Sequence, residues 1–70
     1  MNVYLRHAKT RMYYSGWHNW TIDVKHAVAF ERLEDAMQRA RSEMLSQMEI
    51  VILEGDPVVE RVVPIVEPGS

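Results

Sequence analysis

Residues 33–48 have the sequence LEDAMQRARSEMLSQM, and the spacing of its apolar residues decides the fold. Successive apolar positions are one, three or four residues apart, which traces one side of a helix with 3.6 residues per turn. They are Leu33, Ala36, Met37, Ala40, Met44, Leu45 and Met48. No Gly or Pro interrupts the stretch, and its residues favour helix. The pattern predicts one amphipathic helix of about 17 residues, roughly 25 Å long.

The predicted helix has an acidic first turn but no good cap. Glu34 and Asp35 complement the positive end of the helix dipole. Arg32 precedes them and offers no acceptor, whereas Ser or Asp at that position would cap the helix. Because a lone amphipathic helix is marginally stable in water, we expect a sheet to cover its apolar stripe. The residues expected to seat the helix on that sheet are Phe30, Leu33, Met37 and Met44.

A β-hairpin is predicted before the helix. Residues 3–7 alternate in the manner of a strand, with Leu5 toward the helix. Residues 12–15 form the returning strand, and the turn between the strands places Arg6 opposite Tyr13. The side chains expected on the outer face are Tyr4, Arg6 and Tyr13.

The chain between this hairpin and the helix carries turn signals. Gly16 predicts a break or bulge, and residues 17–19 predict a loop. Trp20 is large and apolar, so we place it under the helix. Asp23 is expected to cap a single helical turn over residues 24–27.

A second hairpin is predicted after the helix. The β-branched run at residues 49–54 predicts a strand that is central or buried on both faces. Residues 55–57 predict a turn, and residues 58–63 an antiparallel strand. Pro64 lacks an amide donor, which suits an edge position or a strand end. Residues 67–70 predict a frayed tail.

The expected architecture is α+β in the order β-β-α-β-β. It consists of a three- to four-stranded, mainly antiparallel sheet with one long amphipathic helix on one face. Residues 1–66 would form this single small domain, because 70 residues lie near the lower limit for a self-supporting core. The chain has no cysteine, so disulfides and thiolate ligands cannot supplement that core.

Four short motifs lie between residues 12 and 36. They are Tyr13-Tyr14-x-Gly16, Trp20-Thr21-x-Asp23, Ala27-x-x-Phe30 and Glu34-Asp35-Ala36. Together they resemble the pattern YYxGxxWTxDxxxAxxFxSxEEA of small β-β-α-β proteins found in bacterial and phage genomes. Members of that family carry no established activity, so the resemblance implies the fold and a bacterial, phage or mobile-element origin. The chain departs from the pattern at Arg32, where the family usually has a capping Ser, and it adds a terminal hairpin.

Charge and hydropathy exclude several classes of function. The net charge is −2, with four cations and one acid in residues 1–26 and four cations and nine acids in residues 27–70. This balance argues against strong non-specific DNA binding but leaves room for a small basic patch. The longest apolar runs have four residues, too few for a membrane-spanning helix. No signal-peptide pattern is present, so we expect a cytoplasmic protein without membrane contact.

No catalytic or metal-binding set is expected. The three histidines, His7, His18 and His26, lack helical i,i+4 spacing, and no Cys or carboxylate stands at a recognised ligand spacing. The serines have no Gly-rich elbow. The helix dipole already explains the carboxylates of Glu34 and Asp35. We therefore expect no enzyme, cofactor or metal.

Aromatic and cationic residues of the first hairpin are the remaining candidates. Tyr, Trp and Arg dominate the hot spots of protein interfaces, so we predict a protein-interaction module whose partner is another protein or a second copy in a homodimer. The predicted partner-binding residues are Tyr4, Arg6, Tyr13, Trp17, Arg11 and His18. The alternative is that this aromatic and basic face stacks the bases of single-stranded nucleic acid, which the small net charge ranks second. A third interpretation is that these residues only stabilise and solubilise the hairpin.

Overall fold

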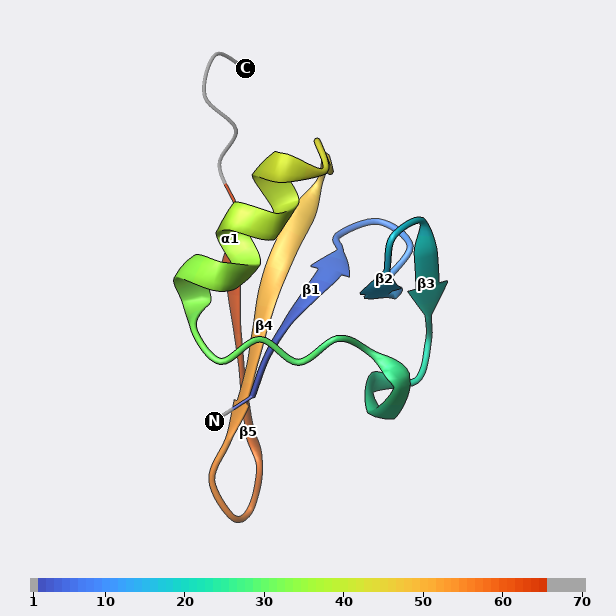
Figure 1. Cartoon of the computed structure of the whole chain (residues 1–70). Coiled ribbons are helices and arrows are strands. Elements are labelled where there is room, and N and C mark those ends of the chain that lie inside the picture. The colour runs from blue at the N-terminus through green and yellow to red at the C-terminus, as the bar shows by residue number, and fades with distance from the viewer. Residues whose placement is uncertain (1, 66–70) are drawn as a thin grey trace.

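A computed structural model describes residues 2–65, which form an antiparallel sheet of five strands with a single α-helix across one face (Figure 1). The strands lie in the spatial order β3-β2-β1-β4-β5. The elements are β1 Asn2–His7, β2 Tyr13–Gly16, β3 Asn19–Thr21, a 3₁₀-helix Val24–His26, α1 Leu33–Ser42, β4 Met48–Glu54 and β5 Val59–Pro64. The predicted frayed tail at residues 67–70 lies outside the described residues.

The α+β class is confirmed, but the predicted strand number and order are wrong. The sheet has five strands rather than three or four, in the order β-β-β-α-β-β. The additional strand is β3, where we predicted the end of a loop and an isolated Trp20. Gly16, at φ 137°, makes the predicted bulge, and a tight turn then pairs Trp20 with Tyr14. This strand forms because β2 offers it a free edge.

The predicted length of the helix is also wrong, because α1 ends at Ser42. The amide of Met44 donates to the carbonyl of Arg41 (3.1 Å), and the amide of Leu45 donates to that of Ala40 (2.9 Å). These two bonds define a Schellman motif, which requires a left-handed residue, usually Gly. Met44 fills that position at φ 55° and is 88% exposed. The prediction that Met44 seats the helix is therefore wrong.

The core lies between α1 and the face of the sheet that α1 covers. The predicted start of the helix is confirmed at Leu33, and Arg32 makes no side-chain capping bond. Leu33 and Met37 pack against the core from α1, as predicted. The buried residues of the core are Val3, Leu5, Tyr14, Phe30, Ala36, Ala40, Met48 and Ile50.

The segment before the helix is fixed by backbone bonds to β1 and β2. Asp23 caps the 3₁₀-helix by accepting from the amide of Lys25, as predicted. Phe30 bridges to Val3 through two backbone bonds, of 2.7 and 3.3 Å. These bonds hold the Phe30 ring in the core, where burial of a side chain of this size contributes about 2–3 kcal/mol. Trp20 is half-buried and packs edge-on against the Tyr14 ring, with centroids 6.0 Å apart, at the margin of the core.

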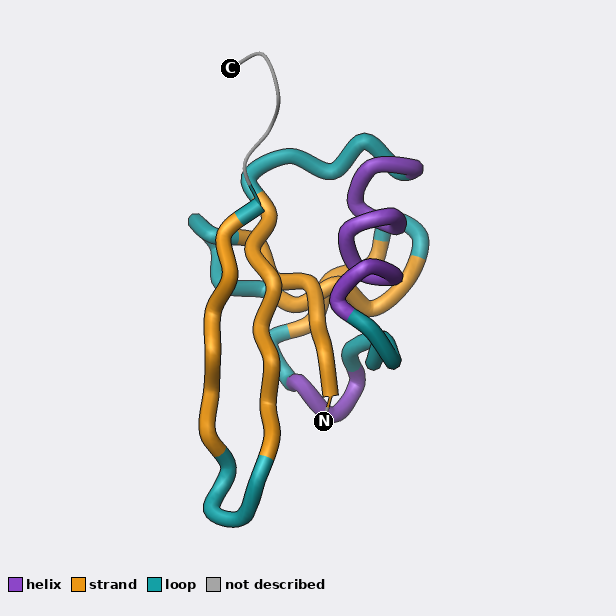
Figure 2. The backbone as a smooth tube through the Cα atoms, turned by 90° about the vertical axis from the view of Figure 1, so that its left-hand side faces the viewer, coloured by secondary structure: helices purple, strands orange, loops and turns teal. Residues whose placement is uncertain are grey.

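The two strands that flank β4 have different surroundings. β4 is central, as predicted, with β1 on one side and β5 on the other. β5 is an edge strand that ends at Pro64, which confirms the position expected for that residue. α1 packs mainly on β1 and β4. The turn of the β4–β5 hairpin extends past the other elements (Figure 2), and every residue of β5 is exposed.

Candidate interaction surfaces

The sheet face away from α1 carries Tyr4 and Arg6, as predicted, but these side chains are not on the surface. Tyr4 is 8% exposed and Arg6 is 9% exposed, so the expectation that they lie outside is wrong. The Tyr13 ring covers both, with its centroid 6.1 Å from the Tyr4 ring and 5.9 Å from the Arg6 guanidinium carbon. Glu49, next to Arg6 across the β1–β4 ladder, completes the cover. Tyr4 and Arg6 thus build a second, smaller buried layer.

An ion-pair cluster occupies the centre of this layer. The Arg6 Nε donates to Glu49 Oε2 at 2.7 Å, and a second guanidinium nitrogen of Arg6 donates to the same oxygen. Glu60 on β5 pairs with Arg6 at 3.3 Å, and Arg11 from the β1–β2 turn pairs with Glu49 at 3.3 Å. Burial lowers the pKa of Arg6, but the hydrogen bonds and attraction of Glu49 and Tyr13 outweigh it and raise the pKa overall. Arg6 and Arg11, the two arginines among the predicted site residues, are therefore both paired with carboxylates.

Trp17 and His18 lie at the other end of β2 from Arg11. They form the tight β2–β3 turn, in which His18 takes a left-handed conformation at φ 59°. Trp17 is 64% exposed and contacts the His18 ring edge-on, at 4.5 Å between centroids. A strand of four residues, about 13 Å long, separates this turn from the β1–β2 turn. The structure therefore divides the six predicted residues into three groups. Tyr4, Arg6 and Tyr13 form the covered layer, Arg11 is exposed but pairs with Glu49, and Trp17 and His18 form an exposed aromatic turn.

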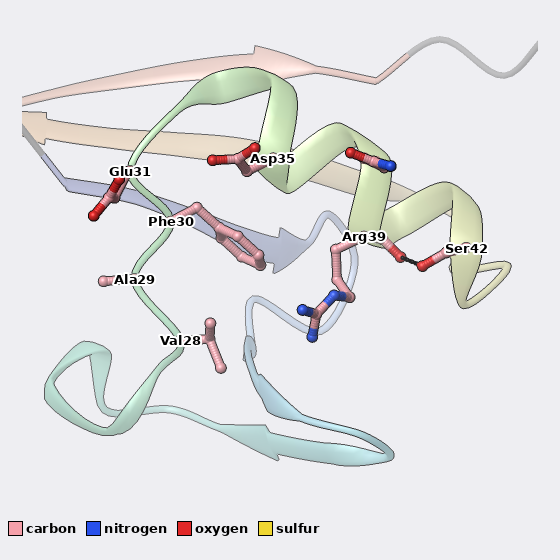
Figure 3. A pocket seen from close by; sticks show the side chains of 8 residues that line it. Val28, Ala29, Phe30, Glu31, Asp35, Arg39 and Ser42 are labelled. Atoms are coloured by element: carbon pink, nitrogen blue, oxygen red, sulfur yellow. Dashed lines mark hydrogen bonds between the residues drawn. The ribbon is translucent and has the colours of Figure 1, made fainter.

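A shallow groove of about 520 Å³ runs between α1 and the segment that leads into it (Figure 3). Its lining residues are Val28, Ala29, Phe30, Glu31, Asp35, Gln38, Arg39 and Ser42. The Arg39 guanidinium carbon lies 6.0 Å from the centroid of the Phe30 ring. The groove combines one aromatic ring with groups of both charges.

A buried tether lies beside this groove. The Tyr14 hydroxyl donates to the Glu43 carboxylate, with oxygen distances of 2.7 and 2.8 Å, and Arg39 donates to the Tyr14 hydroxyl at 3.4 Å. Burial and the Glu43 carboxylate raise the pKa of Tyr14, while Arg39 lowers it by less. The phenol is thus held in its neutral form and joins β2 to the end of α1. Its role is structural, because Tyr14 is only 1% exposed.

Valines of the β4–β5 hairpin form the largest exposed apolar set. Four of the seven large hydrophobic residues exposed in the described chain belong to it. They are Val58 (66%), Val59 (53%), Val62 (45%) and Val63 (38%). We call them the β5 valines; Val58 lies in the turn directly before β5, and the other three lie in the strand. None of the predicted site residues lies on β5, although two Val-Val pairs followed by Pro64 are a signal for an apolar edge strand.

Within residues 2–65, no group of three or more His, Asp or Glu side chains is placed to hold a metal ion. No helix in that range is long and apolar enough to cross a membrane.

Comparisons of the chain with protein-family models, curated proteins and solved structures find no match. The resemblance to the β-β-α-β proteins stays a prediction.

Proposed function

We propose that the chain is a small protein-interaction module that binds another protein chain along the free edge of β5. The observation that supports this most is the exposure of the β5 valines on a strand that, within residues 2–65, pairs with β4 alone. An uncovered edge strand presents backbone donors and acceptors to an incoming strand, and adjacent apolar side chains add burial. Monomeric proteins usually protect such edges with charge.

The charges of β5 protect its edge poorly. Glu60 and Arg61 are the only charged residues of the strand. Glu60 is turned away from the edge, because its carboxylate pairs with Arg6 of β1 at 3.3 Å. Arg61 is then the one charged side chain left at the edge, and its neighbours on the same face of the strand, Val59 and Val63, are apolar. This arrangement favours pairing over repulsion.

The backbone of β5 also leaves its outward groups available. The amide of Ile65 donates to the carbonyl of Met48 (3.3 Å), a directly opposed pair in the β4–β5 register. Because bonded and non-bonded pairs alternate in an antiparallel ladder, every second residue from Ile65 faces β4. The residues whose backbone groups face outward are Glu60, Val62 and Pro64. The backbone nitrogen of Pro64 thus faces away from β4, so its lack of an amide proton removes no hydrogen bond between β5 and β4.

Nothing in the geometry favours the nucleic-acid alternative. Stacking of bases needs exposed rings beside unpaired cations, whereas Tyr4 and Arg6 are buried and Arg11 pairs with Glu49. Trp17 and His18 remain as a small exposed aromatic turn. We therefore place the interaction surface on β5, with Trp17 as the competing site.

Affinity capture with the immobilised chain tests this proposal. Proteins retained from a lysate of the source cells by the wild type should be lost with Val62→Lys, which places a charge at the centre of the edge. Ile22→Lys is the matched control, because Ile22 is 82% exposed and lies away from β5. The proposal fails if Val62→Lys retains the same proteins. Loss of capture with Trp17→Ala alone would move the interface to the β2–β3 turn.

A further inference from the structure

We propose that the chain bound along β5 is a second copy of this protein, with the two β5 strands antiparallel about a twofold axis at Val62. This inference rests on the proposed edge-pairing function and names its partner. A twofold axis normal to the sheet makes the faces of the two copies continuous, so directly opposed residues must lie on the same face. Such an axis therefore passes through one residue of β5, which faces its own copy.

Like charges exclude two of the central positions. An axis at Arg61 sets two guanidinium groups directly opposite each other. An axis at Glu60 does the same with two carboxylates, which Arg6 of each copy offsets only in part, because Arg6 already pairs with Glu49 and Glu60 is half-exposed. Directly opposed like charges destabilise a strand pair. The axis is thus confined to the apolar end of the strand, at Val62 or Val63.

Backbone hydrogen bonds separate these two positions. With the axis at Val62, the two Val62 residues exchange two bonds, and each Glu60 amide donates to the Pro64 carbonyl of the other copy. Both outward amides of residues 60–64 are then used. With the axis at Val63, Val62 faces Pro64 of the other copy, and the proline has no amide to donate. The Val62 register makes four bonds within residues 60–64, and the Val63 register makes two.

The side chains fit the Val62 register as well. The two Val62 side chains meet on the face away from α1, while on the α1 face Val63 lies opposite the aliphatic stem of Arg61. Pairing about this axis therefore buries Val62 and Val63, which are 45% and 38% exposed in the single chain. Pairing of two short strands buries on the order of 1,200 Å² or less, which is the range of weak complexes. We expect dissociation constants on the order of micromolar or weaker.

Sedimentation equilibrium of the purified chain, at concentrations up to about 1 mM, tests whether the partner is a second copy. The wild type should shift from monomer to dimer, and Val62→Lys should weaken the dimer at least about tenfold, because it opposes two ammonium groups at the axis and removes the burial of two valines. Ile22→Lys should leave the dimer unchanged. A wild-type chain that stays monomeric throughout overturns self-association. If Val62→Lys nevertheless abolishes capture of a different protein, edge pairing stands and only its partner is wrong.

Disulfide trapping tests the register independently, since the natural chain has no cysteine. Arg61 and Val63 of the other copy form a non-hydrogen-bonded pair, with Cα atoms about 4.5 Å apart, within the range that a disulfide spans. Mixing Arg61→Cys with Val63→Cys in oxidised glutathione should give the mixed dimer, resolved by mass, at least about fivefold above either homodimer. Predominant Arg61→Cys or Val63→Cys homodimers would overturn the Val62 axis.

Discussion

β1 and β5 flank the same central strand, β4, yet one is buried and the other is exposed. Every residue of β1 from Val3 to Arg6 is buried, whereas every residue of β5 is exposed. α1 and Phe30 cover one face of β1, and Tyr13 and the ion-pair cluster cover the other. β5 has neither cover. The difference shows that the fate of an apolar strand depends on what the rest of the chain places over it.

The largest effects should come from the covered strand. Arg6→Met leaves Glu49 with only the exposed Arg11, and Glu49→Leu leaves Arg6 with only the half-exposed Glu60. Each change should lower the free energy of unfolding by about 3 kcal/mol, because the remaining partner replaces the lost one only in part. The double variant removes both charges and should recover most of that loss. Urea denaturation of the wild type, the two single variants and the double variant measures these free energies of unfolding. Single variants that each cost under about 1 kcal/mol would show that β1 does not depend on its cluster.

A smaller loss is expected where β2 is tied to α1. Tyr14→Phe keeps the ring in the core but removes the bond to Glu43, a loss of about 2 kcal/mol for a hydrogen bond to a charged group. Urea denaturation at neutral pH measures it. Tyr4→Phe is the matched control, since Tyr4 is also buried but its hydroxyl makes no hydrogen bond within the described residues. Equal losses for both variants would contradict a special role of the tether.

The raised pKa of Tyr14 gives this tether a pH signature. In the folded chain the phenol holds its proton to a higher pH than the unfolded value of 10.0. Its stabilising contribution is therefore complete below pH 10 and is lost as the pH rises through the folded pKa. Stability of the wild type should fall above pH 10, and Tyr14→Phe should show a shallower fall. Parallel curves for the two proteins would refute the upward shift.

The smallest effect concerns the exposed end of α1. Met44 holds a left-handed conformation that Gly adopts without steric cost. Met44→Gly should raise the free energy of unfolding by about 0.5–1 kcal/mol, since the side chain it removes is exposed. Thermal unfolding measures the gain against Met37→Gly, which should destabilise. A loss of stability in Met44→Gly would show that the methionine packs on the fold.

Local patterns allowed much of the fold to be predicted. The Arg6–Tyr13 pairing, the bulge at Gly16, the Asp23 cap and the start of α1 depend on neighbours in sequence, and the structure confirms them. The end of α1 could not be predicted in this way. Apolar spacing continues through Met44, whereas the helix ends because the chain must turn back to enter β4.

The candidate site was harder to predict, because it depends on distant residues. Arg6 is buried by Glu49, 43 residues along the chain, and no local pattern contains that pair. Trp17 and His18 form an exposed turn. The sequence predicted a loop at residues 17–19 but left open whether Trp17 is buried. β5 is exposed because α1 packs mainly on β1 and β4. An apolar strand pattern alone does not say whether a helix will cover it.

Hydrogen exchange of the β5 amides, followed by NMR at several protein concentrations, tests the central claim most directly. The amides of Arg61 and Val63 face β4 and should be protected at every concentration. The outward amides of Glu60 and Val62 should exchange quickly in dilute protein and slow progressively as the concentration rises. Exchange of Glu60 and Val62 at the same fast rate throughout would contradict pairing of β5 with a second copy.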